Sequence, residues 1–260
     1  MFDVIIYPIG ELFYFIYSYV SSDISLISAY AVTIIVTTIL LKIMMYPLNR
    51  KQMKSAQKME KLQPKLMELK EEYKDDKEML NIKMMEFYKE NKFNPLGGFL
   101  PILIQMPLII AFYNVIRDPM TYIFKDPEVY MNIDKSFFWI KDLGVKSDFI
   151  FQGGIVNGLN LGISLPLIGN AIPILALIAA ITTYFSSQQV TKDNDGNSFQ
   201  KNMMMMMPIM IFLFALNMPA GLTLYWIISN IMQIIQKYID RIEIEDIFVG
   251  FKKMMKIVIN

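Results

Sequence analysis

Cysteine and histidine are both absent from the 260-residue sequence. Without them the chain cannot form a disulfide framework, a thiol nucleophile, a zinc site built on Cys or His, or a Ser-His-Asp triad. An N-terminal lipid anchor on cysteine is not expected for the same reason. The phosphate-binding pattern GxxxxGK[ST] is missing too, so nothing indicates nucleotide hydrolysis. We therefore predict a protein that is not an enzyme and has no metal or other cofactor.

Positive charge is missing from the first part of the chain, which contains no Lys or Arg before Lys42. A cleavable signal peptide begins with a basic stretch, so none is expected here. Between Lys42 and Lys92, in contrast, Lys and Arg recur throughout. Because cytoplasmic segments of membrane proteins are rich in these residues, the distribution predicts an N-terminus outside the membrane and a cytoplasmic segment at 49–94.

Long apolar runs dominate the rest of the composition, with 54% hydrophobic residues and a mean hydropathy of +0.37. These values are typical of a membrane protein. Residues 26–48 are long enough to cross a bilayer and carry one full charge, Lys42. Lys42 lies about 9 Å from the end of this run, at 1.5 Å per residue. Two interpretations are open: its amine extends to the lipid headgroups, or it faces a wet pocket inside the protein.

The predicted fold class is an all-α polytopic membrane protein. It has five transmembrane helices, a cytoplasmic helical hairpin between the first two, and an N-terminal interfacial helix. The expected location is the bacterial plasma membrane, with the N-terminus outside and the C-terminus in the cytoplasm. The segments are an interfacial helix (1–25), span one (26–48), the cytoplasmic hairpin (49–94), span two (95–117), an extracytoplasmic segment (118–166), span three (167–190), a cytoplasmic loop (191–202), span four (203–218), span five (219–237) and a cytoplasmic tail (238–260).

The N-terminal segment is predicted to lie on the membrane rather than to cross it, because Pro8 and Gly10 leave only a short apolar run after them. A disordered lead-in is the alternative. In the hairpin, Lys74–Asp76 suit a tight reversal and Pro64 predicts a kink in the first arm. Its methionines form either a seam between the two arms or an adaptable surface that binds peptides.

Polar residues of three predicted spans gather in the cytoplasmic half of the membrane. Thr38 and Lys42 lie there in span one, and the polar end of span three, 182–189, lies at the same depth. Span five carries a stripe at i, i+4, i+7 and i+11 that begins at Trp226 and ends at Lys237. A channel needs a polar lining from end to end, so the pattern predicts instead a pocket open to the cytoplasm and sealed outside.

Four blocks of sequence are shared with a known family. They are KIMMYPLNRKQ (42–52), LQPK (62–65), EFYKENKFNPLGGFLPILIQMP (86–107) and MPAGLTLYWIISN (218–230). Together these blocks closely resemble the YidC family of membrane protein insertases in its short form, which has relatives in mitochondria and chloroplasts. The resemblance implies a five-helix core, a cytoplasmic hairpin and a positively charged groove in the inner leaflet.

The resemblance also implies which residues line that groove. The family's usual arginine falls at Lys42, which keeps the charge but lacks the bidentate fork of arginine. Thr38 and Trp226 match positions along the substrate path, and Gln105 falls in the LIQMP block. The predicted substrate-groove residues are Thr38, Lys42, Gln105, Gln188, Trp226, Asn230 and Gln233.

The sequence thus predicts an insertase. It would receive hydrophobic segments of new membrane proteins in a cytoplasm-facing hydrophilic groove and release them into the bilayer without nucleotide hydrolysis. The alternative is a folding and assembly chaperone that acts beside the general translocon. Expected partners are nascent membrane proteins and membrane lipids, with the ribosome and the general translocon as further candidates. We expect the chain to work as a monomer.

Overall fold

The computed structural model describes residues 3–20, 27–93, 100–145, 159–165, 169–188 and 198–259. These residues are mainly helical, with one short antiparallel pair of strands, β1 with β2. The elements are α1 (Asp3–Tyr19), α2 (Ala29–Met44), α3 (Tyr46–Glu72), α4 (Lys77–Glu90), α5 (Leu100–Arg117), the π-helical turn η2 (Met120–Phe124), α6 (Pro127–Met131), β1 (Leu159–Leu165), β2 (Gly169–Ile172), α7 (Ile174–Gln188), α8 (Ser198–Asn217) and α9 (Ala220–Ile259).

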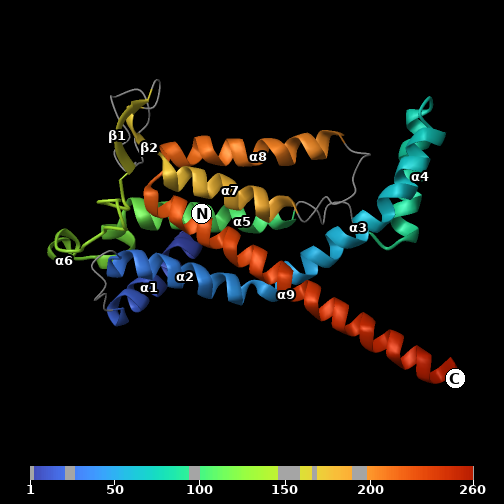
Figure 1. Ribbon diagram of the computed structural model, residues 1–260, viewed down its shortest axis with the longest axis horizontal. Helices are drawn as coiled ribbons and strands as arrows, with labels where there is room; N and C mark the ends of the chain where they lie inside the picture. Colours follow the sequence, from blue (N-terminus) through green and yellow to red (C-terminus); the bar gives the residue numbers. More distant parts are fainter. Residues whose placement is uncertain are drawn as a thin grey trace.

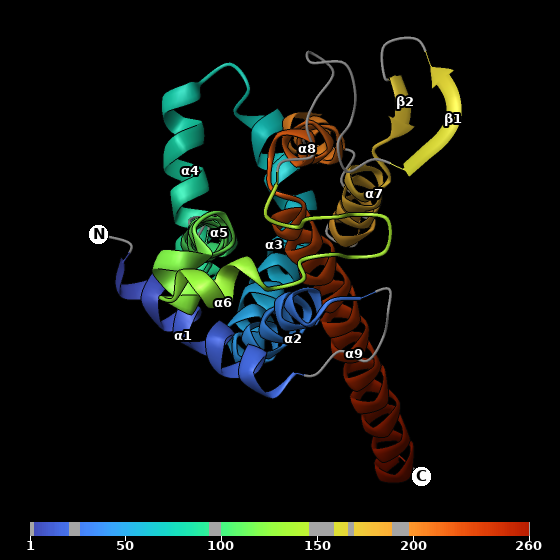
Figure 2. The same ribbon diagram turned by 90° about the vertical axis from the view of Figure 1, so that its left-hand side faces the viewer.

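Helix α9 runs through the centre of the molecule. Helices α7 and α8 lie on one side of it, and α1 and α2 lie on the other (Figures 1 and 2). The core between them is apolar and includes the fully buried side chains of Ile34, Phe112 and Leu222. The C-terminal half of α9 extends away from this bundle, and α3 and α4 extend from the same end in another direction (Figure 1). The bundle therefore has one compact end and one end from which long helices project.

Helix α2 begins at a serine cap and ends before a proline. The hydroxyl of Ser28 accepts a hydrogen bond from the Ala31 amide at 3.1 Å, which satisfies one free donor of the first turn. At the other end α2 stops at Met44, and α3 starts directly afterwards with a proline in its first turn. Because Pro47 has no amide hydrogen, it cannot bond the carbonyl four residues earlier, and the two helices are separate elements. We call residues 42–50 the α2–α3 hinge.

The helix bounds differ in places from the predicted spans. Predicted span three starts at 167, whereas the structure places β2 at Gly169–Ile172 and begins α7 at Ile174, directly after a proline. Predicted span five ends at 237, whereas α9 continues without a break to Ile259. Within the described residues, no helix reaches both the length and the mean hydropathy expected of a membrane crossing.

Helices α3 and α4 occupy the stretch predicted to be a helical hairpin. Asp76 caps α4 by accepting a hydrogen bond from the Met79 amide at 2.9 Å, and Pro64 lies inside α3. The side chains of Met67, Met79 and Met85 are exposed, so these methionines do not form a closed seam between the two helices.

Helix α1 is packed against the bundle and is not a disordered lead-in. Ile6, Ile9, Phe13 and Ile16 are buried on one face, against α2, α5 and η2. The contact with η2 is very close at Gly10, where an added Cβ would lie 2.1 Å from the backbone oxygen of Tyr122. Only glycine allows this approach. That α1 lies on a membrane surface remains a prediction.

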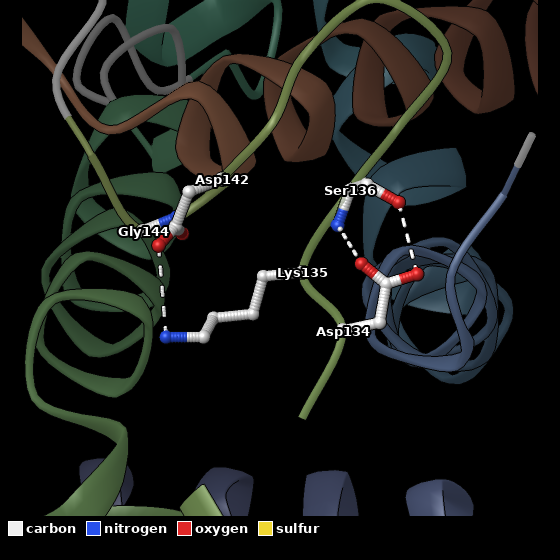
Figure 3. Close-up of polar contacts among 5 residues, drawn as sticks. All are labelled: Asp134, Lys135, Ser136, Asp142 and Gly144. Atoms are coloured by element: carbon white, nitrogen blue, oxygen red, sulfur yellow. Dashed lines mark hydrogen bonds and ion pairs between the residues drawn. The ribbon is translucent and has the colours of Figure 1, made fainter. Parts of the chain in front are cut away.

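Residues 134–145 close the compact end of the bundle, which we call the capped end. The Ser28 amide at the start of α2 donates to the Ser136 carbonyl at 3.2 Å, and the Gly221 amide at the start of α9 donates to the Leu143 carbonyl at 2.8 Å. Figure 3 shows the polar contacts that shape the segment. Lys135 lies 3.6 Å from a carboxylate oxygen of Asp142 and 4.0 Å from the ring centre of Tyr130. The segment thereby joins the starts of α2 and α9.

Candidate functional site between the helices

The amine of Lys42 lies inside the bundle. Its side chain is 7% exposed, although it carries the one charge of an otherwise apolar helix. The Nζ atom donates a hydrogen bond to Oε1 of Gln105 on α5 at 3.2 Å. Of the two interpretations that the sequence left open, the structure therefore agrees with an amine that faces the protein interior.

A second hydrogen bond extends this contact to α9. Nε2 of Gln105 donates to the hydroxyl of Tyr225 at 2.8 Å. The ring of Tyr225 stacks on Phe112 of α5, with ring centres 4.1 Å apart. Tyr225 was not among the predicted site residues. Gln105 therefore joins the charge on α2 to a buried aromatic residue on α9.

Thr38 lies one turn before Lys42 on the same face of α2 and is fully buried. Its hydroxyl donates to the Ile34 carbonyl at 2.6 Å, within its own helix. This local bond satisfies the donor of the hydroxyl and leaves its oxygen able to accept a further hydrogen bond.

A separate polar interface joins α7 to α9. Asn230 donates from Nδ2 to the hydroxyl oxygens of Thr183 at 2.9 Å and Thr182 at 3.2 Å. The indole of Trp226 donates to the same Thr183 oxygen at 3.2 Å, and the Ser186 hydroxyl donates to Oδ1 of Asn230 at 3.4 Å. We call these five residues the α7–α9 polar interface.

The predicted residues therefore divide between two faces of α9. Lys42 and Gln105 meet the face that carries Tyr225, whereas Trp226 and Asn230 meet α7. Gln233 is exposed and lies outside both groups. Gln188 is the last residue of α7, and its side chain lies outside the described residues.

Two further residues lie near the projecting end and were not among the predicted groove residues. Lys237, 7% exposed, donates to the carbonyl of Ser186 in the last turn of α7. Gln236 donates from Nε2 to the carbonyl of Lys42 at 2.8 Å. The sequence carried a signal for Lys237, because it ends the polar stripe of α9 that begins at Trp226.

The described residues contain no group of three or more Asp or Glu side chains that could hold a metal ion. What they offer are two buried ammonium groups, on Lys42 and Lys237, among amides and hydroxyls on α2, α5, α7 and α9. Such groups bind polar or acidic partners through charge and hydrogen bonds.

Polar side chains that bond across the helices of an otherwise apolar bundle are typical of a helical membrane protein. The chain belongs to the family described as 60Kd inner membrane protein, whose family model matches residues 22–246. This confirms the resemblance seen in the sequence, since relatives in the comparison carry the name membrane protein insertase YidC.

The relatives differ in length. The protein of Fusobacterium nucleatum is 36% identical over 209 residues, which cover 80% of this chain and 84% of the relative. The protein of Pelodictyon phaeoclathratiforme is 38% identical over 212 residues, which cover 82% of this chain and 33% of the relative. The protein of Syntrophobacter fumaroxidans is 35% identical, with 34% of its length covered. The chain thus spans most of one relative and about a third of the other two.

A solved structure shares the fold. It is described as an active YidC insertase crystal structure with the first transmembrane domain resolved. The similarity covers 91% of this chain and 46% of that chain, with a TM-score of 0.54 and 18% sequence identity. At this level of identity the similarity supports the helical architecture of the bundle.

Proposed function

We propose that this protein is a membrane protein insertase. It receives hydrophobic segments of newly made membrane proteins in a cytoplasm-facing hydrophilic groove and releases them into the bilayer without nucleotide hydrolysis. One observation carries the proposal: the Lys42 ammonium is held inside the helix bundle, with the neutral amide of Gln105 as its hydrogen-bond partner. The names of the relatives support the same function.

A neutral amide that accepts a hydrogen bond from a buried ammonium group does not neutralise its charge. Removing such a charge from water is unfavourable, and a carboxylate partner offsets that cost better than an amide does. An acidic residue that flanks the hydrophobic segment of a client can provide this carboxylate. The charge would then hold the polar end of the client while its apolar segment moves along the helices into lipid.

The proposal includes the membrane arrangement predicted from the sequence. Five helices cross the bilayer, the N-terminus lies outside, and the α3–α4 hairpin and the C-terminus lie in the cytoplasm. The Lys and Arg residues of 49–94 support this orientation. In this orientation the α2–α3 hinge and Lys42 lie toward the cytoplasm, and the capped end lies outside. The protein acts as a monomer on nascent chains, and the ribosome and the general translocon are candidate partners.

The test is insertion of a single-spanning client into liposomes that contain the purified protein. Lys42→Arg keeps the charge and should preserve insertion, whereas Lys42→Glu should abolish insertion of a client with an acidic flank. Lys51→Glu, at an exposed lysine of α3, is the matched control and should retain activity. Equal activity of the Arg and Glu variants at position 42 contradicts the electrostatic role.

The alternative function, a folding and assembly chaperone beside the general translocon, has support of its own. An open apolar groove of about 560 Å³ lies between α7 and α8 and is suited to side chains of another helix. Its lining residues are Leu177, Ala180, Ile181, Tyr184, Phe185, Pro208, Ile209 and Phe212. Crosslinks from a stalled nascent chain separate the two functions. Crosslinks at Thr38, Lys42 and Trp226 support the insertase, and crosslinks at Ile181 and Phe212 without them support the chaperone.

A further inference from the structure

Two residues of α9, Gln236 and Asp240, bind residues at both ends of the α2–α3 hinge. Gln236 donates from Nε2 to the carbonyl of Lys42 at 2.8 Å, at the start of the hinge, and accepts at Oε1 from Asn49 at 3.3 Å, near its end. One turn further along α9, Oδ1 of Asp240 accepts a hydrogen bond from the Tyr46 hydroxyl at 2.6 Å. The same oxygen lies 3.1 Å from Nε of Arg50.

These contacts are shielded from solvent. The side chain of Asp240 is 6% exposed and that of Arg50 is 35% exposed. Gln236 is 5% exposed. A carboxylate at this depth is unfavourable unless hydrogen bonds and an opposite charge compensate it, and Tyr46 and Arg50 provide both. Breaking the contact therefore leaves a buried charge without its partner, so the arrangement with Asp240 bound to Tyr46 and Arg50 is strongly favoured.

The contacts also lie where the helical hydrogen bonding of the backbone is interrupted. The hinge separates α2 from α3, and Pro47 removes one of the hydrogen bonds that would make them a single helix. After the hinge, α3 and α9 diverge (Figure 1). Long polar side chains, from Tyr46, Asn49 and Arg50, bridge the point of divergence. The direction in which α3 leaves the bundle therefore depends on these bridges.

We propose that Asp240 is a positioning residue that fixes the orientation of the α3–α4 hairpin relative to the bundle. Gln236, one turn before Asp240 on the same face of α9, couples this orientation to the backbone of Lys42. Release of Asp240 allows the hairpin to swing about the hinge. The proposal concerns the hairpin and holds whether or not the protein inserts clients.

The absence of native cysteine makes the test direct. Cysteines placed at Met85 on α4 and Met131 on α6, both strongly exposed, are spin-labelled, and the distance between the labels is measured by pulsed electron paramagnetic resonance. The wild-type background should give a narrow distance distribution. Asp240→Leu should broaden it to at least about twice that width, because motions of whole elements become accessible. Tyr46→Phe removes one hydrogen bond to Asp240 but keeps its ion pair with Arg50, so it should broaden the distribution less.

Two controls separate a positioning role from general destabilisation. Glu71→Gln removes an exposed carboxylate on the same hairpin and should leave the distribution unchanged. The exchange of Arg50→Asp with Asp240→Arg restores opposite charges and should narrow the distribution again. An unchanged distribution in both Asp240→Leu and Tyr46→Phe, with circular dichroism showing folded protein, overturns the proposal. Because no client is present, this outcome is independent of any insertion result.

Discussion

Tyr225 and Trp226 are adjacent in sequence, yet their side chains bind different helices. The Tyr225 hydroxyl accepts a hydrogen bond from Gln105 on α5, and the Trp226 indole donates one to Thr183 on α7. Adjacent residues of a helix point about 100° apart, so α9 presents one polar face to each neighbour. Helix α9 is therefore the element through which the Lys42 contact and the α7–α9 polar interface are connected.

The contact between Lys42 and Gln105 should be measurable as a coupling energy. Gln105→Leu leaves a buried ammonium without its acceptor and should lower the free energy of unfolding by about 1–3 kcal/mol. The double variant with Lys42→Met has no buried ammonium group that needs an acceptor. Its loss of unfolding free energy should therefore be smaller than the sum of the two single losses. The measurement is unfolding in detergent micelles by denaturant. Strictly additive losses contradict the contact.

Asn230 and Gln233 form a matched pair for testing the α7–α9 polar interface. Asn230→Leu removes bonds to Thr182, Thr183 and Ser186 and should destabilise the protein by about 1–2 kcal/mol, since bonds between membrane helices are individually modest. Gln233→Leu, at an exposed position of the same helix, should change stability by less than about 0.5 kcal/mol. The same unfolding assay compares the two variants. Equal losses of stability contradict a stabilising role for the α7–α9 polar interface.

Gly10 should not tolerate even a methyl group. In Gly10→Ala the new Cβ meets the Tyr122 backbone oxygen at 2.1 Å, so α1 must shift away from η2, at a cost of about 1–3 kcal/mol. Gly144→Ala is the control, because its nearest contact is a side-chain oxygen of Asp142 at 3.2 Å, so a much smaller shift relieves it. Hydrogen exchange of the α1 amides reports the result. Equal exchange rates in the two variants contradict the close approach.

The ion pair of Lys125 with Glu11 predicts a dependence on pH. The hydrogen bond to Glu11 raises the pKa of Lys125 above its ordinary value of 10.5. The stabilisation is thus complete below the ordinary pKa and is lost as pH rises through the raised one. Both side chains are more than half exposed, so the effect is small and weakened by salt. The melting temperatures of wild type and Lys125→Gln should differ slightly at about pH 9 and converge by about pH 12.

Much of the architecture was predictable from the sequence. The position of the hairpin followed from its charges and the reversal near Asp76, and the family followed from shared blocks of sequence. The short strands β1 and β2 were not predicted, because a Gly- and Asn-rich stretch lacks the β-branched and aromatic residues that usually mark strands. The continuation of α9 past 237 was also not predicted, since the charged composition that begins there indicates a tail and does not distinguish it from a continuing helix.

The candidate site was predictable in part. Lys42 is buried and contacts Gln105, which the resemblance rather than the depth of the polar residues had placed in the groove. The sequence predicts that the stripe from Trp226 to Lys237 faces the same cytoplasm-facing pocket as Lys42. Spacing along one helix does not reveal, however, which neighbouring helix each face meets. Tyr225 and Gln236 were missed for this reason, because partners on α2 and α5 become visible only in three dimensions.

The attachment at residues 134–145 has a mechanical consequence for α2 and α9. Because both helices are hydrogen-bonded to this segment where they begin, pivoting about it lets them separate without breaking these bonds. Helix α2 has 16 residues and acts as a lever about 24 Å long. A tilt of about 10° would displace the end of α2 beside Lys42 by about 4 Å. A small rotation about the attached end is therefore enough to make room for a side chain.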